Sequence, residues 1–386
     1  MAVLGNLIEQ VRGVSYKPED LHTTLNEDSI ILLRANNIKD GKLNFDDVVY
    51  VDKKKVSEKQ ILKAGDILIC ASSGSKELVG KAAYVESDLQ MTFGAFCKVA
   101  RPKTACPKYI GHFFNSPYYR EQIANSAAGA NINNIRNEHI DVLEIVWPSM
   151  EEQHSAVAIL DKVTELIAMR KEQLAKLDEL VKSRFIELFG DQKTNPHNLK
   201  VGKLSDVADI YLGLTHTPTY VEQGKPFLSV RDISSGEIDF SNCHYITEEE
   251  FDSLPKGARP QAGDMLFCRV GTIGKPVIIP ENTPEFGTFV SVGYLRKKTN
   301  VNNCYLKAWM ENEYFMRQVY DNVAGASQIN LNTGWLKNFR ILIPPIDLQN
   351  QFTSFVEQTD KSKSAIQQSL DKLELLKKSL MQKYFG

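Results

Sequence analysis

The chain contains the same long unit twice. The segment Pro148-Ser-Met-Glu-Glu-Gln153 returns as Pro344-Pro-Ile-Asp-Leu-Gln349, and the ending Leu188-Phe189-Gly190 returns as Tyr384-Phe385-Gly386. Both segments recur 196 residues later, from 148 to 344 and from 190 to 386, so no gap is needed between them. A repeat of this length constrains the fold more than any local pattern does. We expect two similar structures end to end, at about 1–190 and 191–386.

Shorter matches extend the repeat toward the start of each copy. Ala64-Gly65-Asp66 matches Ala262-Gly263-Asp264, and Ile132-Asn133 matches Ile329-Asn330. Short apolar stretches that follow Gly-Asp turns are typical of buried strands. Helical patterns follow later in each copy, at 107–127 and 302–323. The sequence therefore predicts an α+β protein with two similar mixed α/β domains.

Each copy ends in a long helical pattern with apolar residues at seven-residue spacing. From Glu151 to Phe189 there is no Gly or Pro. A sustained heptad repeat is typical of a coiled coil, and a helix of about forty residues would be roughly 60 Å long. The residues that we expect to pack between the helices are Leu160, Ile167, Leu174, Leu177, Val181, Ile366, Leu370, Leu373 and Leu380.

Charged residues interrupt the two apolar seams at different positions. Arg170 and Arg184 interrupt the first seam, whereas Lys363 and Lys377 interrupt the second. Like charges that face each other in a buried seam would be costly, so unlike positions suit one helix packing against the other. The alternative is that each helix packs only on its own globular part. Such a contact would rarely keep seven-residue spacing for five repeats.

Composition narrows the classes of protein that this chain can belong to. No apolar stretch approaches the length of a membrane span, and the start of the chain lacks the pattern of a secretion signal. The six cysteines are scattered without a CxxC pair, which indicates reduced thiols in the cytoplasm. The formal net charge of −2 gives no bulk attraction to nucleic acid. Any DNA binding must therefore depend on local groups.

Patterns of catalytic and cofactor sites are incomplete or missing. The segment Gly271-Thr-Ile-Gly274-Lys275 resembles a phosphate-binding loop, but Arg269 replaces its first glycine and Pro276 follows the lysine. The seven histidines are dispersed and form no HxxxH pair. There is also no Asn-Pro-Pro-aromatic motif of the kind that an amino-methyltransferase uses. We expect no catalysis by this chain alone, no metal and no cofactor.

The order and duplication of these motifs resemble the DNA-specificity subunit of Type I restriction–modification systems. The resemblance rests on the two hexapeptides, on the endings LFG and YFG, and on Asn195-Pro196 leading into 203–210. It covers essentially the whole chain. It implies two target-recognition domains, 1–147 and 191–343. Each is followed by a spacer helix, 148–190 and 344–386, and the helices pair antiparallel with pseudo-two-fold symmetry.

The resemblance also implies a function and partners. Each recognition domain would read one half of a split, asymmetric target in double-stranded DNA. Two methyltransferase subunits would dock on the chain, and restriction or translocase subunits would join them. S-adenosylmethionine and ATP would belong to those partners. The alternatives are a methylation-only or other restriction architecture, a coiled-coil scaffold whose heads bind proteins, and a hydrolase hidden in the heads.

Polar residues in the predicted turns are the candidates for DNA contact, because Asn and Gln can pair with adenine and Arg with guanine. In the first copy they are Arg34, Asn36, Asn37, Ser72, Ser73, Ser75, Lys76, Asn131, Asn133, Asn134 and Arg136. In the second copy they are Arg231, Asp232, Arg269, Thr272, Lys275, Ser327, Gln328, Asn330 and Asn332. The alternative for each is a turn residue that satisfies local backbone groups.

Overall fold

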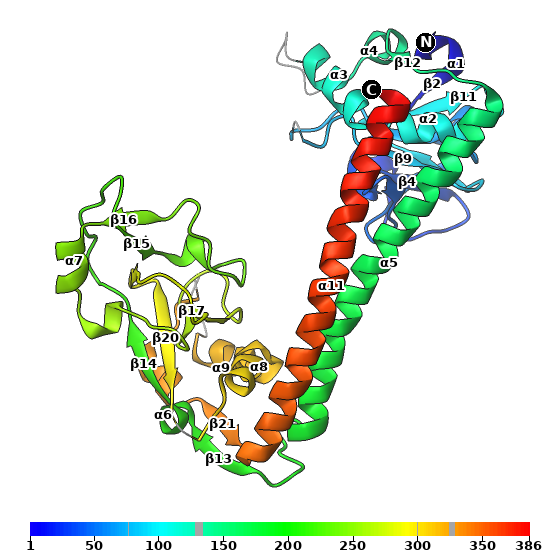
Figure 1. The fold of residues 1–386 in the computed structure, drawn as a ribbon. Helices are drawn as coiled ribbons and strands as arrows, with labels where there is room; N and C mark the ends of the chain where they lie inside the picture. The colour runs from blue at the N-terminus through cyan, green and yellow to red at the C-terminus, as the bar shows by residue number, and fades with distance from the viewer. Residues whose placement is uncertain (76, 128–133, 299, 324–328) are drawn as a thin grey trace. The chain divides into compact units, whose positions relative to one another are not determined.

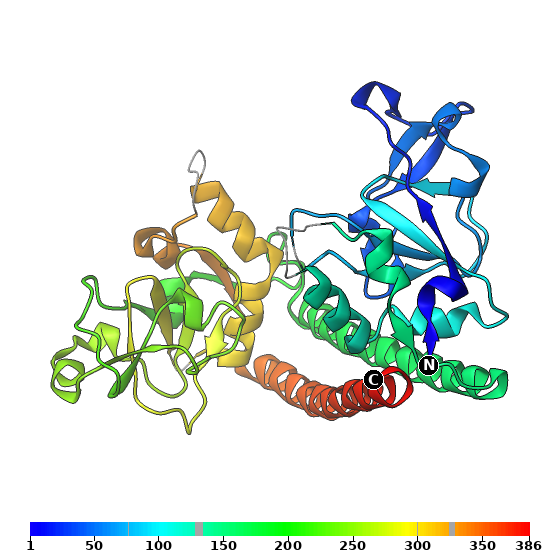
Figure 2. The same ribbon diagram turned by 90° about the horizontal axis from the view of Figure 1, so that it is seen from above.

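The chain folds into two compact units. The computed structural model describes residues 1–75, 77–127, 134–298, 300–323 and 329–386. Unit 1 consists of Met1–Glu172 and Gln367–Gly386, and unit 2 consists of Gln173–Ile366. Each unit contains one globular head and one end of each of two long helices, α5 (Met150–Phe189) and α11 (Ile346–Phe385). Both ends of the chain lie in unit 1, as two views show (Figure 1, Figure 2).

Short strands dominate the head of unit 1. The strands are β1 (Ala2–Val3), β2 (Ile8–Arg12), β3 (Leu21–His22), β4 (Ser29–Leu33), β5 (Ile38–Lys39), β6 (Lys42–Leu43), β7 (Val49–Asp52), β8 (Ile67–Cys70), β9 (Ala82–Tyr84), β10 (Met91–Phe93), β11 (Cys97–Pro102) and β12 (Glu144–Ile145). The helices are α1 (Leu4–Leu7), α2 (Pro107–Phe113), α3 (Pro117–Ala127) and α4 (Asn137–Asp141), with 3-10 turns at Pro18–Asp20, Ala35–Asn37, Lys53–Lys55 and Glu58–Gln60.

The head of unit 2 has a similar series of elements. The strands are β13 (Lys200–Lys203), β14 (Ala208–Leu212), β15 (Lys225–Leu228), β16 (His244–Ile246), β17 (Met265–Cys268), β18 (Val277–Ile278), β19 (Gly287–Thr288), β20 (Val292–Lys297) and β21 (Arg340–Ile343). The helices are α6 (Leu204–Val207), α7 (Glu248–Ser253), α8 (Asn303–Glu311), α9 (Glu313–Asn322) and α10 (Thr333–Lys337), with 3-10 turns at Val230–Asp232 and Lys256–Ala258.

The two heads repeat the same sheet order. An antiparallel sheet has the order β2-β11-β8-β9 in unit 1 and β14-β20-β17-β18 in unit 2. Each head also has a parallel strand pair, β4 with β10 and β15 with β19. A third pair joins the start of each head to the strand before its long helix, β1 with β12 and β13 with β21. The predicted pair of mixed α/β domains is confirmed.

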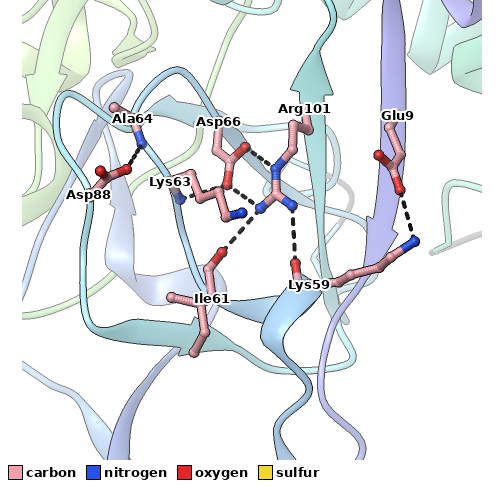
Figure 3. A network of polar contacts seen from close by, with 8 residues as sticks. All are labelled: Glu9, Lys59, Ile61, Lys63, Ala64, Asp66, Asp88 and Arg101. Atoms are coloured by element: carbon pink, nitrogen blue, oxygen red, sulfur yellow. Dashed lines mark hydrogen bonds and ion pairs between the residues drawn. The ribbon is translucent and has the colours of Figure 1, made fainter.

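The repeated Gly-Asp pair forms a turn and a buried ion pair. Gly65 and Gly263 have φ angles of +88° and +81°, a region that favours glycine. Asp66 accepts a hydrogen bond from the Lys63 amide at 2.8 Å and forms an ion pair with Arg101 at 2.7 Å (Figure 3). In unit 2, Asp264 accepts from the Gln261 amide and pairs with Arg296 in the same way. The motif therefore fixes the start of β8 and of β17.

The last residue of each repeated hexapeptide closes the turn before a long helix. The buried side-chain amide of Gln153 donates to the Pro148 carbonyl at 3.0 Å, and that of Gln349 donates to the Pro344 carbonyl at 2.8 Å. Each glutamine thus ties the first helical turn back to the proline that opens its hexapeptide. This shared hydrogen bond explains why both hexapeptides begin with proline and end with glutamine.

Within each unit, α5 and α11 run side by side in opposite directions (Figure 1). In unit 1, Lys171 of α5 forms an ion pair with Glu374 of α11 at 3.0 Å. In unit 2, Asp178 of α5 forms an ion pair with Lys363 of α11 at 2.6 Å. Residue numbers therefore rise along α5 as they fall along α11. This confirms the antiparallel pairing that the family resemblance implies.

The residues predicted for the helix seam differ in burial. Leu160, Ile167 and Leu370 are buried. The remaining six are half-buried, namely Leu174, Leu177, Val181, Ile366, Leu373 and Leu380. Partial burial is expected of a two-helix pair, because the sides of its seam stay open to solvent. Lys363, which interrupts the second seam, has its charge balanced by Asp178 of the other helix.

The end of each long helix completes the head of the other copy. The Phe385 ring is 5.0 Å from the ring of Tyr109 and lies in the same apolar core. In unit 2, the Phe189 ring is 4.8 Å from that of Tyr305, again within one core. Tyr305 also donates its hydroxyl hydrogen to the Leu342 carbonyl at 2.6 Å. Neither head therefore has a complete core without residues from both copies of the repeat.

Candidate nucleic-acid interface

Backbone hydrogen bonds bring several candidate turns of unit 1 into one row, which we call the first loop row (33–37, 94–97, 71–75 and 134–136). The Gly94 amide donates to the Leu33 carbonyl at 2.9 Å, and the Ala71 amide donates to the Phe96 carbonyl at 2.9 Å. The Ile135 amide then donates to the Ala71 carbonyl at 2.7 Å. Three candidate groups that are far apart in sequence thus lie on neighbouring turns.

Unit 2 contains the equivalent second loop row (228–232, 289–292, 269–275 and 329–332). The Phe289 amide donates to the Leu228 carbonyl, the Arg269 amide to the Ser291 carbonyl, and the Leu331 amide to the Arg269 carbonyl, at 2.8 to 2.9 Å. Isolated bridges join Ser72 to Asn134 and Val270 to Asn330. The structure thus matches Asn330 with Asn134, whereas the sequence repeat alone matched it with Asn133.

The side chains of two candidate residues form hydrogen bonds within their own turns and are buried there. Asn37 is 1% exposed; its side chain accepts from the Arg34 amide at 2.8 Å and donates to the Asn44 and Asp47 carbonyls. Asp232 is 4% exposed and accepts from the Ser229 amide at 2.7 Å. These bonds cap a 3-10 turn in each head. They also explain why β15 ends at Leu228, because the 3-10 turn begins at Val230.

Neighbours of these capping residues present polar groups to solvent. The guanidinium of Arg34 and the amide of Asn36 both donate to Asp47 Oδ2, at 2.9 and 2.7 Å. Arg231 is exposed and donates to the Asn242 carbonyl at 2.8 Å. These contacts fix the side chains of both arginines at the end of each loop row, and fixed donors read a base edge with less loss of entropy.

Most of the other candidates in the first loop row are exposed. Ser72 and Ser73 are half-buried, whereas Ser75, Asn134 and Arg136 are exposed. Arg136 forms an ion pair with Glu138 at 3.3 Å. The positions Lys76, Asn131 and Asn133 lie outside the residues that the structure describes. With Arg34 and Asn36, the first loop row therefore combines small hydroxyl groups with two amides and two guanidinium groups.

In the second loop row, Arg269 holds the turns together. Its guanidinium donates to the Leu331 and Val290 carbonyls, both at 3.0 Å, and to Asn330 Oδ1 at 3.3 Å. Burial lowers the pKa of this guanidinium from its usual value. Arg269 therefore supports the row structurally, and the residue at the same place in unit 1 is Ala71.

The remaining candidates of the second loop row differ in their contacts. Thr272 and Lys275 are exposed, as is Asn330. Asn332 caps the start of α10 and accepts a hydrogen bond from the Gly334 amide at 2.7 Å. Ser327 and Gln328 lie outside the described part of the chain. The exposed groups that remain are a hydroxyl, an ammonium group and an amide, a different set from that of the first row.

Buried Lys98 fixes the base of the 134–136 turn. Its side chain, 7% exposed, donates to Asn137 Oδ1 at 2.8 Å and to Gln10 Oε1 at 3.2 Å. Burial lowers the pKa of Lys98 from 10.5 to about 8. Asn137 directly follows Arg136, so this buried amine links the β2-β11 pair to the loop row.

The lowered pKa of Lys98 should make stability depend on pH. The folded pKa is below the unfolded value, so the unfolded chain binds more protons between pH 8 and 10.5. The free energy of unfolding should therefore rise with pH in this window. Between pH 7 and 9, wild type should gain about 1 kcal/mol relative to Lys98→Met, whose side chain does not titrate. Urea unfolding of both proteins at the two pH values tests this. A constant difference would contradict it.

The described residues contain neither a candidate metal site nor a candidate membrane-spanning helix. No group of three or more His, Cys, Asp or Glu side chains in this part of the chain could hold a metal ion. No helix in the same residues combines the length and apolar character that crossing a bilayer requires.

The model of the Type I restriction modification DNA specificity domain matches this chain twice, at residues 20–179 and 196–375. The chain belongs to this family. The specificity subunit of the StySPI Type I restriction enzyme from Salmonella potsdam is 30% identical, over 97% of this chain and 86% of that protein. The EcoKI specificity subunit from Escherichia coli K12 is 32% identical over 70% of this chain, but the match spans only 61% of that protein.

Two solved structures of Type I systems share the fold. A chain from a study of the assembly and conformational transition of a type I R-M system has a TM-score of 0.60 at 16% identity; the match covers 99% of this chain and 96% of that one. The Type I S subunit from M. genitalium has a TM-score of 0.57 at 14% identity, covering 100% and 95%. At these identities the likeness concerns the fold alone.

Membership of the specificity-subunit family confirms the resemblance and the class of function. The chain is a DNA-recognition subunit and not a catalytic one. Sequence reasoning missed Phe96, which lies in the first loop row with an exposed ring. The sequence repeat does not mark it, because the offset of 196 residues pairs Phe96 with Val292, whereas the backbone hydrogen bonds match it with Ser291.

Proposed function

We propose that each head of this specificity subunit reads one half of a split duplex target. The recognition domains would be 1–147 and 191–343, and the segments 148–190 and 344–386 would hold them. The observation that carries the proposal is the pair of loop rows. They have the same backbone hydrogen bonds but different side chains, with Ala71 and Phe96 in one where Arg269 and Ser291 stand in the other. Equal frames with unequal contact groups suit an asymmetric target.

The exposed groups of the loop rows suit contact with base edges. Asn134 and Asn330 occupy matched positions on the two isolated bridges, and both side chains are exposed. An amide at such a position can donate to and accept from adenine in the major groove. Lys275 and Arg136 carry positive charge at the borders of the rows, where phosphate contacts would set the register.

We further propose that the paired helices dock methyltransferase subunits, two per chain, to which restriction subunits are added. Support comes from large apolar side chains that the helices expose outside their seam. In unit 1, Leu375 is 69% exposed and Met169 is 48% exposed; in unit 2, Ile186 is 53% exposed. These apolar side chains of the helices are available for contact with a partner protein. All six cysteines are described and are free thiols, which suits action in the cytoplasm.

Exchange of single heads tests the proposal. Residues 1–147 would be replaced by the corresponding head of a relative with a known target, while both long helices are kept. Selection from a duplex library by the complex with its methyltransferase subunits should then give a target changed in one half only. Each base pair that no longer matches should cost about 1–3 kcal/mol.

The matched control is the exchange of residues 191–343, which should change only the other half. A change of both halves in either chimera would contradict the assignment of one half to each head. Loss of all sequence preference, with the chimera folded and bound to its partners, would favour the scaffold alternative instead.

A further inference from the structure

The first loop row presents one aromatic ring to solvent. Phe96 is 70% exposed, whereas the neighbouring Phe93 and Cys97 are buried. It lies on a tight turn in which the Cys97 amide donates to the Gly94 carbonyl at 2.8 Å. The Phe96 carbonyl accepts from the amides of both Ala71 and Ser72 at 2.9 Å, so the turn lies beside 71–75, where Ser73 and Ser75 are polar. A lone apolar group among polar ones suits contact with an apolar atom on a mostly polar ligand.

The backbone that carries Phe96 is held in place from several sides. The Gly94 amide donates to the Leu33 carbonyl at 2.9 Å, and the Val14 amide donates to the Phe93 carbonyl at 2.8 Å. Gly13 packs so closely that a Cβ there would lie 2.1 Å from the Gly94 carbonyl oxygen. A fixed turn positions its side chain before the ligand arrives, which reduces the entropy lost on binding.

At the position that matches Phe96, the second head has a serine in place of an aromatic residue. Ser291 occupies the position of Phe96, since its carbonyl accepts from the Arg269 amide as that of Phe96 does from the Ala71 amide. Arg269 in turn donates to the Val290 carbonyl, next to Ser291. This difference lies between two matched backbones. It therefore distinguishes what the two heads contact, and not how they fold.

The width of the loop row favours one groove of the DNA. Four chain segments joined by backbone hydrogen bonds at strand-like spacing span about 14 Å. The whole row is wider than either groove, but two neighbouring segments can enter the major groove, roughly 12 Å wide, which admits a two-stranded ribbon, and not the minor groove, roughly 6 Å wide. The apolar group that base pairs present in the major groove is the C5-methyl of thymine.

We propose that Phe96 is a specificity-determining residue that contacts the C5-methyl group of a thymine in the half-site read by the first head. The inference rests on the proposed function, because it requires that the first loop row meets DNA. Phe96 supplies an apolar contact that Ser291 does not supply in the other half. The neighbouring Ser72 and Asn134 supply hydrogen-bonding groups to the same groove.

Deoxyuridine substitution tests the contact, because deoxyuridine lacks only that methyl group. The complex of the full chain with its methyltransferase subunits would bind duplexes in which each thymine of the target is replaced in turn. Wild type should lose about fourfold in affinity at one position of the first half, the loss expected for one buried methyl group. Phe96→Ser should bind the thymine duplex about fourfold more weakly and should not discriminate deoxyuridine. Phe96→Leu should keep most of the discrimination.

Thymines in the second half serve as the internal control, since Phe96→Ser should leave their effects unchanged. The assignment is overturned if Phe96→Ser still discriminates deoxyuridine as wild type does, or if the first half contains no thymine. It is also overturned if the variant weakens cognate and scrambled duplexes equally. If wild type itself does not distinguish cognate from scrambled duplex, the proposed function fails. A thermal unfolding midpoint that Phe96→Ser leaves unchanged shows that the variant is folded, so that its binding results report on the contact.

Discussion

Replacing Phe385 by alanine should destabilise unit 1 by about 3–5 kcal/mol, the usual cost of removing a buried aromatic ring. Phe385 is 1% exposed, and its ring lies 5.0 Å from that of Tyr109 and 6.0 Å from that of Phe113. By sequence Phe385 belongs to the second copy, yet its core is that of the first head. Native-state hydrogen exchange should show faster exchange in β8 and β11 than in β17 and β20.

The matched variant Phe189→Ala should give the reverse pattern. Phe189 is fully buried and packs on Tyr305 in unit 2, although by sequence Phe189 belongs to the first copy of the repeat. Exchange should then accelerate in β17 and β20, with β8 and β11 less affected. If each variant weakened the head of its own copy, the crossed completion of the two cores would be wrong.

Removing the buried carboxylate of Asp66 should destabilise unit 1 by about 3–5 kcal/mol, because Arg101 then loses its counter-charge. Asp66 has a side chain that is 1% exposed, while that of Arg101 is 19% exposed. The Arg101 guanidinium also donates to the Ile61 and Lys59 carbonyls (Figure 3), so Asp66→Ala would also loosen that loop. Denaturant unfolding of Asp66→Ala measures the loss.

A double-mutant cycle separates the ion pair from the other contacts. Asp66→Leu combined with Arg101→Leu should cost less than the sum of the single changes, because neither charge is left unpaired. The equivalent pair in unit 2, Asp264 with Arg296, provides the matched experiment. Strictly additive effects would show that the two charges do not stabilise each other.

The sequence alone predicted the parts of the fold that occur in both copies or that follow a regular spacing of apolar residues. Glu151 to Phe189 was expected to be helical, and α5 extends from Met150 to Phe189, because an uninterrupted heptad pattern has few alternatives. The strands after Gly65-Asp66 and Gly263-Asp264 were also predicted, since glycine allows the left-handed turn that leads into them. Periodicity does not identify the partner of a buried face. The contact of Phe385 with Tyr109 was therefore not foreseen.

The sequence predicted the candidate interface less well than the fold. It named polar residues in these turns but did not predict that 71–75 lies beside 134–136, or 269–273 beside 329–332. It did not separate Asn37 and Arg269, whose polar atoms bond within the head, from exposed residues such as Asn134. Asparagine and arginine side chains can either bond within the head or face solvent. The positions of nearby carbonyl groups, which the sequence does not give, decide which of the two occurs. Phe96 was overlooked because an aromatic residue beside a strand usually indicates core.

The most direct test of the central claim is the methylation pattern in a host that expresses this chain with its methyltransferase subunits. Two heads with the same frame and different contact residues predict one modified motif with two unlike halves and unread base pairs between them. A single uninterrupted motif, or two identical half-sites, would contradict the account.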